Sequence, residues 1–241
     1  MATIDCNLLE VNGRIARACE LAGRPVSGVT LLAVGKTQPP EALRAAFAAG
    51  QARFGENYVQ EALDKIAALA DLRPRLEWHL VGPLQANKTR VVAESFDWVH
   101  SVDRLRIAER LSAQRPAGLG PLQVCLQVNI SGEASKSGVA PAELPALARA
   151  VAALPGLRLR GLMAIPEPAG DLAAQRGPHR VLRQLLEALN AEGLELDTLS
   201  MGMTADLEAA IAEGATIVRI GTAIFGARPP KPAAAGPAAD A

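Results

Sequence analysis

The chain has 241 residues, 49% of them hydrophobic, which is sufficient for the core of one α/β barrel domain. Lysine plus arginine and aspartate plus glutamate number 25 each, so the formal net charge is zero and no general attraction to nucleic acid or to an anionic membrane is expected. Three cysteines without a CxxC pair, no membrane-length apolar run and no secretion signal at the start lead us to expect a reduced, cytoplasmic protein.

The predicted elements begin with a helix over residues 3–22 and then alternate between strands and helices. Segments such as residues 39–50 and 141–154 repeat apolar residues every three or four positions and predict amphipathic helices. Apolar runs between such segments predict eight strands, at residues 29–36, 52–57, 76–83, 98–103, 122–130, 157–166, 194–202 and 215–226.

Strands that are apolar on both faces and separated by crossover helices are typical of parallel sheets covered on both sides. Eight such units predict a closed (β/α)8 barrel of the TIM type, formed by a single domain of residues 1–228. An open doubly wound sheet is the alternative, but no GxGxxG turn follows the first strand. Residues 229–241 are rich in proline and alanine, and we expect them to be a disordered tail or a linker.

The predicted seventh and eighth strands end in loops suited to an anion. Barrels of this type commonly bind phosphate at these two loops, which here contain SMGMT (200–204) and RIGT (219–222). Glycines let backbone N–H groups approach phosphate oxygens, and hydroxyls donate further hydrogen bonds. The alternative is ordinary turn chemistry, with Thr204 capping a helix that begins there. The candidate phosphate residues are Ser200, Gly202, Thr204, Gly221 and Thr222.

Lysine is rare in this chain, with five lysines against twenty arginines, yet Lys36 directly follows the apolar run LLAVG. An ion pair at the barrel rim would suit arginine equally well, whereas a Schiff base requires an amine. Desolvation lowers the pKa of a lysine and leaves a free amine that attacks aldehydes. Pyridoxal 5′-phosphate carries both an aldehyde and a phosphate, but other phosphorylated carbonyl compounds do as well. A non-covalent phosphate ligand with a structural Lys36 is a further alternative.

The sequence also resembles a known family. The segments AVGKT, ARFGENYVQEAL, EWHLVGPLQANKTR, SKSG, RGLMAIP, LSMGMTADLEAAI and VRIGTAIFGAR occur in this order over residues 8–228. They are similar to signatures of the pyridoxal phosphate homeostasis proteins, which are small relatives of the alanine racemase barrel. The resemblance implies a pyridoxal phosphate barrel of fold type III without an additional β domain. It also implies a role in intracellular vitamin B6 homeostasis without robust catalysis.

For individual residues, the resemblance implies that Lys36 carries the cofactor as a Schiff base and that Asn57 lies beside the ring. It implies that Arg219 faces the pyridine nitrogen, where a cation keeps this nitrogen unprotonated and makes the ring a weaker electron sink. The phosphate is then surrounded by Ser200, Gly202, Thr204, Gly221 and Thr222.

Three positions depart from the family pattern. Gly35 stands where serine commonly precedes the lysine, Gln38 where a second lysine is frequent, and Thr204 where serine is usual, although threonine keeps the hydroxyl. The missing amine at position 38 puts in doubt any scheme in which a neighbouring lysine passes the cofactor to Lys36. Lys136, within SKSG, is a candidate second amine; the alternative is a solvated loop lysine.

The alternative function is a pyridoxal phosphate-dependent amino-acid racemase or isomerase, which needs a second acid or base on the ring face opposite the lysine. Tyr58 is the only tyrosine, and we expect it to pack at the start of a helix. His79 and His100 are expected to be core or rim residues of strands, and His179 to lie in a helix. No histidine pair has ligand spacing, so we expect no metal.

Racemases of this type also carry an additional β domain, for which we expect no room after the eighth strand. We therefore expect a carrier that is not an enzyme. It would be a monomer that binds pyridoxal phosphate and makes transient contacts with pyridoxal phosphate-dependent apoenzymes.

Overall fold

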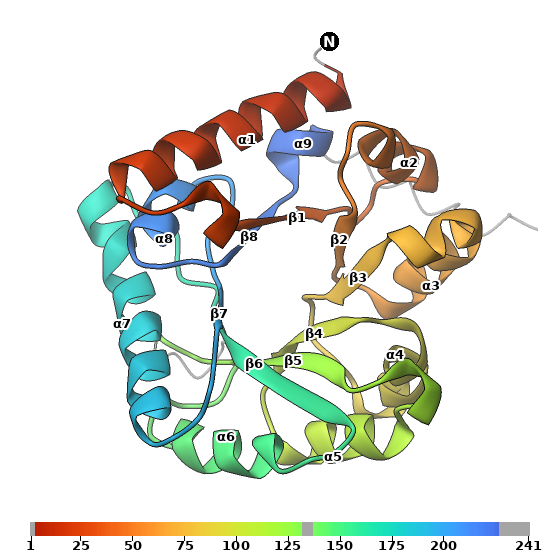
Figure 1. Ribbon diagram of the computed structural model, residues 1–241, viewed down its shortest axis with the longest axis vertical. Helices are drawn as coiled ribbons and strands as arrows, with labels where there is room; N and C mark the ends of the chain where they lie inside the picture. The colour runs from red at the N-terminus through yellow and green to blue at the C-terminus, as the bar shows by residue number, and fades with distance from the viewer. Residues whose placement is uncertain (1–2, 132–136, 227–241) are drawn as a thin grey trace, which may run out of the picture.

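The computed structural model of the chain describes residues 3–131 and 137–226. The predicted tail at residues 229–241, the predicted domain end at residue 228 and Lys136 lie outside these ranges. Eight parallel strands, β1 to β8, follow one another around one closed barrel (Figure 1). The predicted (β/α)8 fold is therefore confirmed, and the open doubly wound sheet is excluded.

Each strand lies within one of the predicted apolar runs. The strands are β1 (Thr30–Val34), β2 (Arg53–Glu56), β3 (Glu77–Leu80), β4 (Trp98–Val102), β5 (Leu122–Gln127), β6 (Leu157–Met163), β7 (Thr198–Ser200) and β8 (Ile217–Ile220). The α-helices are α1 (Ile4–Leu21), α2 (Pro40–Ala48), α3 (Val59–Ala68), α4 (Thr89–Ser95), α5 (Leu105–Gln114), α6 (Leu144–Ala152), α7 (Leu172–Ala191), α8 (Leu207–Ala212) and α9 (Thr222–Phe225). Short 3-10 helices are η1 (Val26–Gly28), η2 (Ala70–Arg75), η3 (Ala86–Lys88) and η4 (Ala117–Leu119).

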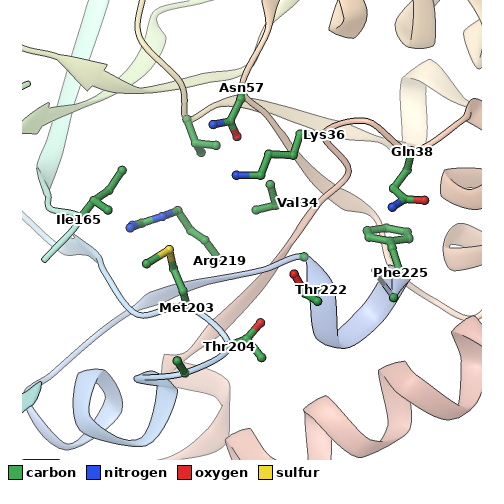
Figure 2. A pocket seen from close by; sticks show the side chains of 14 residues that line it. Val34, Lys36, Gln38, Asn57, Ile165, Met203, Thr204, Arg219, Thr222 and Phe225 are labelled. Carbon is green, nitrogen blue, oxygen red and sulfur yellow. The ribbon is translucent and has the colours of Figure 1, made fainter. Parts of the chain in front are cut away.

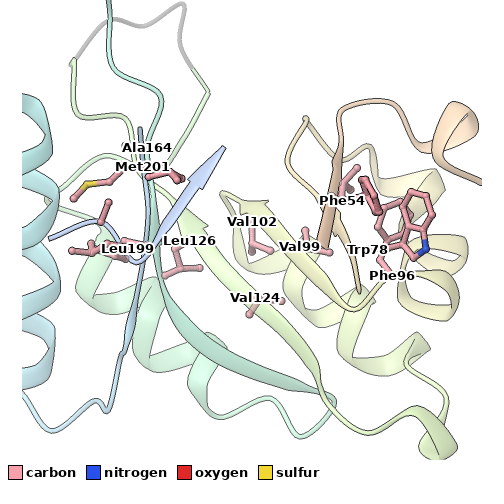
Figure 3. Packing of buried hydrophobic residues seen from close by; sticks show 14 of the residues in the cluster. Phe54, Trp78, Phe96, Val99, Val102, Val124, Leu126, Ala164, Leu199 and Met201 are labelled. Carbon is pink, nitrogen blue, oxygen red and sulfur yellow. The ribbon is translucent and has the colours of Figure 1, made fainter. Parts of the chain in front are cut away.

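The barrel sheet separates two hydrophobic clusters, because alternate residues of a strand point to opposite faces. Leu31 and Ala33 belong to the large cluster that packs the strands against the helices. Leu32 points the other way, into a smaller cluster inside the barrel. Figure 3 shows part of the large cluster, where Phe54 and Trp78 lie with their ring centroids 5.9 Å apart. The smaller cluster inside the barrel consists of Leu32, Val81, Trp98, Cys125, Met163 and Ile217.

Helix α1 lies against α8 and α9 (Figure 1). Its buried residues recur every three or four positions, as the amphipathic pattern requires, and are Leu8, Val11, Ile15, Ala18 and Cys19. The Nδ2 of Asn7 donates to the carbonyl oxygen of Ile224 at 2.8 Å. This contact fixes α9 against α1, so the last turn of the described chain has a defined position. None of the described helices combines the length and apolar character that a membrane span requires.

Two details of the predicted C-terminal elements are wrong. The apolar run at residues 215–226 was predicted to be one strand, but β8 ends at Ile220 and the rest forms α9. The chain turns at Gly221, where an added Cβ would lie 3.0 Å from the carbonyl oxygen of Val34. Helix α8 was predicted to begin at Thr204, but it begins at Leu207. The carboxylate of Asp206 accepts the N–H of Met203 at 2.7 Å and holds the preceding residues in a turn.

Candidate functional site

A cavity of about 290 Å³ opens at the C-terminal ends of the strands. Six of the eight residues predicted for the site line it, from β1, β2, β7 and β8 or the loops that follow them, and these are Lys36, Asn57, Thr204, Arg219, Gly221 and Thr222. Figure 2 shows the side chains of Lys36, Asn57 and Arg219 pointing into a common space. Ser200 and Gly202 are not part of the lining.

Lys36 follows β1 directly and is half-buried, with its side chain directed into the cavity (Figure 2). Gly35 before it is tightly enclosed, because an added Cβ would lie 2.9 Å from both Glu56 Oε1 and Leu43 Cδ1. Thr37 after it has a φ of 65°, in the left-handed region. The loop that carries Lys36 is therefore constrained on both sides.

Arg219 is the buried cation of the site. It lies in β8, faces the barrel interior and is 5% exposed. Its Nη1 donates to the carbonyl oxygen and to the Oγ of Ser200, and its Nη2 donates to the carbonyl oxygen of Ala164 at 2.8 Å. Burial lowers the pKa of Arg219 to about 10, so the guanidinium remains charged at neutral pH.

Ser200 lies beneath Arg219 and belongs to a buried hydrogen-bond chain that crosses the barrel. Its Oγ is 2.8 Å from Nη1 of Arg219 and 2.7 Å from Nδ1 of His100. The Nε2 of His100 is 2.8 Å from Nδ1 of His79, whose Nε2 is 2.8 Å from Oε1 of Glu77. Arginine only donates and a carboxylate only accepts, so with neutral histidines every N–H or O–H of the chain points toward Glu77. The chain thus links the site to the opposite end of β3.

His79 and His100, the two histidines of this hydrogen-bond chain, are fully buried. Burial lowers the pKa of each, that of His100 well below its usual value. For His79 the hydrogen bond to Glu77 opposes the lowering without cancelling it. His79 and His100 lie in β3 and β4, as predicted, and His179 lies in α7. This hydrogen-bond chain was not predicted from the sequence; the available signal was one inward-facing histidine on each of two neighbouring strands.

The loop between β7 and α8 brings Thr204 to the cavity. Gly202 shapes this loop with a φ of 92°, and an added Cβ would lie 2.5 Å from Ala210 Cβ. Asp206 accepts hydrogen bonds from the N–H of Met203 and from Nε2 of His179. Burial alone would raise the pKa of Asp206, but these two hydrogen bonds outweigh it and lower the pKa. The loop is therefore tied down by a charged carboxylate.

A second set of hydrogen bonds holds the loop between β7 and α8 from outside the barrel. The Nη2 of Arg14 in α1 donates to the carbonyl oxygen of Thr204 at 3.0 Å and also binds the carboxylate of Glu208. Gly221 and Thr222 lie at the start of α9, where the first N–H groups of a helix point outward and attract anions. One side of the cavity is thus formed by the hydroxyl-bearing residues Thr204 and Thr222 and the start of α9.

Asn57 reaches the cavity from the loop after β2 and depends on a neighbouring glycine. An added Cβ on Gly82 would lie 2.1 Å from the backbone oxygen of Asn57. Tyr58, the next residue, precedes α3 as predicted but is 59% exposed, so the expectation that it packs there is wrong. Only the backbone of Asn57 is confined by Gly82, which leaves its amide directed toward the cavity (Figure 2).

The donor set of the cavity fits pyridoxal phosphate. It combines a primary amine on Lys36, a permanent cation on Arg219, and two hydroxyls beside a helix start. These groups match an aldehyde, a pyridine nitrogen and a phosphate, respectively. Gln38 also lines the cavity, so the position where relatives carry a second lysine presents an amide there.

Comparisons with known proteins agree with this fit. The family model of the alanine racemase N-terminal domain matches residues 5–229. The pyridoxal phosphate homeostasis protein of Pseudomonas aeruginosa is 65% identical over 228 residues, which cover 95% of this chain and 97% of that protein.

Solved structures show the same similarity. PipY of Synechococcus elongatus, determined with PLP bound, has a TM-score of 0.77 and 41% identity, covering 88% of this chain and 100% of that one. Alanine racemase of Corynebacterium glutamicum has a TM-score of 0.68 at 19% identity, covering 90% of this chain and 60% of that one, which shows the shared fold alone.

Proposed function

This chain belongs to the family of the alanine racemase N-terminal domain and, within it, to the pyridoxal phosphate homeostasis proteins, and on that premise we propose that Lys36 anchors pyridoxal phosphate covalently in the cavity. The protein binds pyridoxal phosphate and serves in its homeostasis. The observation that carries the proposal is the amine of Lys36 in one cavity with the buried guanidinium of Arg219 and the start of α9.

Each cavity residue has a distinct role in this proposal. Thr204, Gly221 and Thr222 bind the phosphate through hydroxyl and N–H groups, and Asn57 contacts the ring. Arg219 lies on the side of the pyridine nitrogen. Ser200 and Gly202 act indirectly, the first by holding the guanidinium and the second by shaping the loop.

The same residues favour storage over catalysis. Bound pyridoxal phosphate supplies an electrophilic aldehyde and an electron-withdrawing ring. Arg219 remains positively charged and so opposes protonation of the pyridine nitrogen, which weakens the stabilisation of a carbanion. Of the cavity-lining residues in the described ranges, only Lys36 and Arg219 have ionisable side chains, whereas racemisation needs a second acid or base opposite the lysine. The protein therefore holds the cofactor and releases it to apoenzymes without turnover.

The visible absorbance spectrum with added pyridoxal phosphate tests the anchor. We expect the wild type to become yellow and Lys36→Ala to stay colourless, with Lys88→Ala in η3 as a lysine control. Borohydride reduction and peptide mapping should place the pyridoxyl group on Lys36. A reduced protein without this label would refute the covalent anchor.

Turnover assays separate the carrier from the racemase. We expect cofactor transfer to an apoenzyme and no racemisation of alanine or serine with catalytic amounts of protein. Sustained racemisation that disappears in Lys36→Ala would favour the racemase.

A further inference from the structure

A buried lysine in α3 binds the backbone next to Lys36. The Nζ of Lys65 donates to the carbonyl oxygen of Gly35 at 2.7 Å, to Glu56 Oε1 at 2.8 Å and to Glu61 Oε1 at 2.6 Å. An ammonium has three N–H donors, so these contacts use all of them. Lys65 is 3% exposed, and Glu56 is completely buried.

The same cluster also reaches the other side of Lys36. Glu61 Oε1, which accepts from Lys65, accepts the backbone N–H of Thr37 as well. Lys65 therefore holds Gly35 directly and Thr37 through one carboxylate. Both chain neighbours of Lys36 are bound to a single ammonium and its partners.

The backbone of Thr37 adopts a conformation that is unfavourable for its own residue type. Among the described residues it is the non-glycine residue with a positive φ, and it is β-branched, which makes that conformation unfavourable. Such a conformation persists only where surrounding contacts determine it, and residues in such conformations cluster at functional sites. The hydrogen bond from Thr37 to Glu61 supplies such a contact.

A contribution to the stability of the fold does not by itself explain why charged residues occupy these buried positions. Removing two charges from water often costs as much as their attraction returns, so apolar residues of similar size would stabilise α3 and β2 about as well. The distinctive feature of the cluster is which parts of the chain its hydrogen bonds connect. The three acceptors of Lys65 lie on β2, on α3 and on the loop that carries Lys36, and the last of these is a backbone oxygen.

We propose that Lys65 is a positioning residue: together with Glu56 and Glu61 it clamps the backbone on both sides of Lys36, so that the Lys36 amine meets the ligand aldehyde in one orientation. Lys65 is not part of the cavity lining and acts through the backbone. The proposal rests on the proposed covalent role of Lys36. It concerns the joining of Lys36 Nζ to the aldehyde carbon, in which the carbonyl oxygen leaves as water with the two amine protons.

Two ligands separate positioning from general damage to the site. Pyridoxal phosphate can attach to Lys36, whereas pyridoxine 5′-phosphate has an alcohol in place of the aldehyde and can bind only non-covalently. The test variant is the double substitution Glu56→Gln with Lys65→Met, which leaves no buried carboxylate without its cation. The control is Lys88→Met, the same change at a half-buried lysine outside the cavity lining.

The rate of attachment is followed by visible absorbance and the affinity for pyridoxine 5′-phosphate by calorimetry. We expect the double variant to attach pyridoxal phosphate about 10- to 100-fold more slowly, because small misplacements of reacting groups have effects of this size. Its affinity for pyridoxine 5′-phosphate should stay within about twofold of wild type, as a cavity with an intact phosphate site requires. The proposal would be overturned if the double variant attached pyridoxal phosphate at the wild-type rate. It would also be overturned if the attachment rate and the affinity for pyridoxine 5′-phosphate fell by the same factor.

A second variant keeps the test decisive if the double variant does not fold. Glu61→Leu removes the acceptor of Thr37 but leaves the contacts of Lys65 with Gly35 and Glu56, and the Glu61 side chain is 28% exposed. We expect the same selective slowing to a smaller extent. A wild type that itself fails to attach pyridoxal phosphate at Lys36 would refute the proposed function, whereas normal attachment in every variant would refute only the clamp.

Discussion

Glu56 provides a quantitative test of the electrostatics beside Lys36. Burial raises the pKa of its carboxyl from 4.5 to about 7, because the loss of hydration outweighs the attraction of Lys65. Within the described part of the chain, its Oε2 has no hydrogen-bond partner, which is consistent with a carboxyl that is poorly solvated when charged. Glu56→Gln removes the titration and keeps the shape.

The sign of the effect follows from proton binding in the two states. Between pH 4.5 and about 7 the folded chain keeps a proton that the unfolded chain has lost. The contribution of Glu56 to stability is therefore fully present below pH 4.5 and is lost as the pH rises through 7. The interval between the two pKa values corresponds to about 3 kcal/mol. Relative to wild type, Glu56→Gln should gain about this much free energy of unfolding from pH 4 to pH 8.

Urea unfolding of ligand-free wild type and ligand-free Glu56→Gln from pH 4 to pH 8 measures the difference between their free energies of unfolding. Glu213→Gln is the matched control, because this buried carboxylate has a lowered pKa: burial opposes the lowering, but hydrogen bonds from Arg180 and Arg176 outweigh it. Its contribution should instead be lost only as the pH falls below about 4.5, so between pH 5 and pH 8 the difference in free energy of unfolding between wild type and Glu213→Gln should stay nearly constant. A wild-type minus Glu56→Gln difference that stays constant from pH 4 to pH 8 would show that the Glu56 pKa is not raised.

Two further substitutions test the supports of the site. Gly82→Ala places a Cβ 2.1 Å from the backbone oxygen of Asn57, so we expect a loss of about 1–3 kcal/mol and weaker binding of pyridoxal phosphate, measured by thermal unfolding and titration. An unchanged Tm would contradict the contact. His100→Leu leaves the O–H donor of Ser200 without an acceptor and His79 Nδ1 without a donor, each at a cost of about 1–3 kcal/mol, and urea unfolding at pH 7 should show at least about 2 kcal/mol of destabilisation. Equal stability would mean that the hydrogen-bond chain contributes nothing.

Much of the architecture could be predicted from local sequence. Strands buried on both faces and separated by amphipathic helices leave few packing solutions other than a helix-covered parallel sheet, and eight repeats close it into a barrel. The position of Lys36 after an apolar run places its amine at the barrel mouth, because the C-terminal ends of all strands meet there. The same logic brought Thr204, Gly221 and Thr222 together.

Apolar content alone did not fix where elements end. The run that contains β8 stays apolar through Phe225, yet the chain leaves the sheet at Gly221 and forms α9. Similarly, Thr204 has a good capping side chain, but Asp206 occupies the residue before α8 because its carboxylate is bound by His179 from another helix. At the start of α8, a tertiary contact thus outweighed the local capping preference.

The sequence by itself determined the repeat of strands and helices and the residue types at the barrel mouth, because both depend on patterns within a few positions. Only the tertiary structure decided that Ser200 supports Arg219 and that Lys65 reaches both neighbours of Lys36. These contacts join residues from different strands and helices, and they depend on the register and closure of the barrel, which set which side chains meet across it.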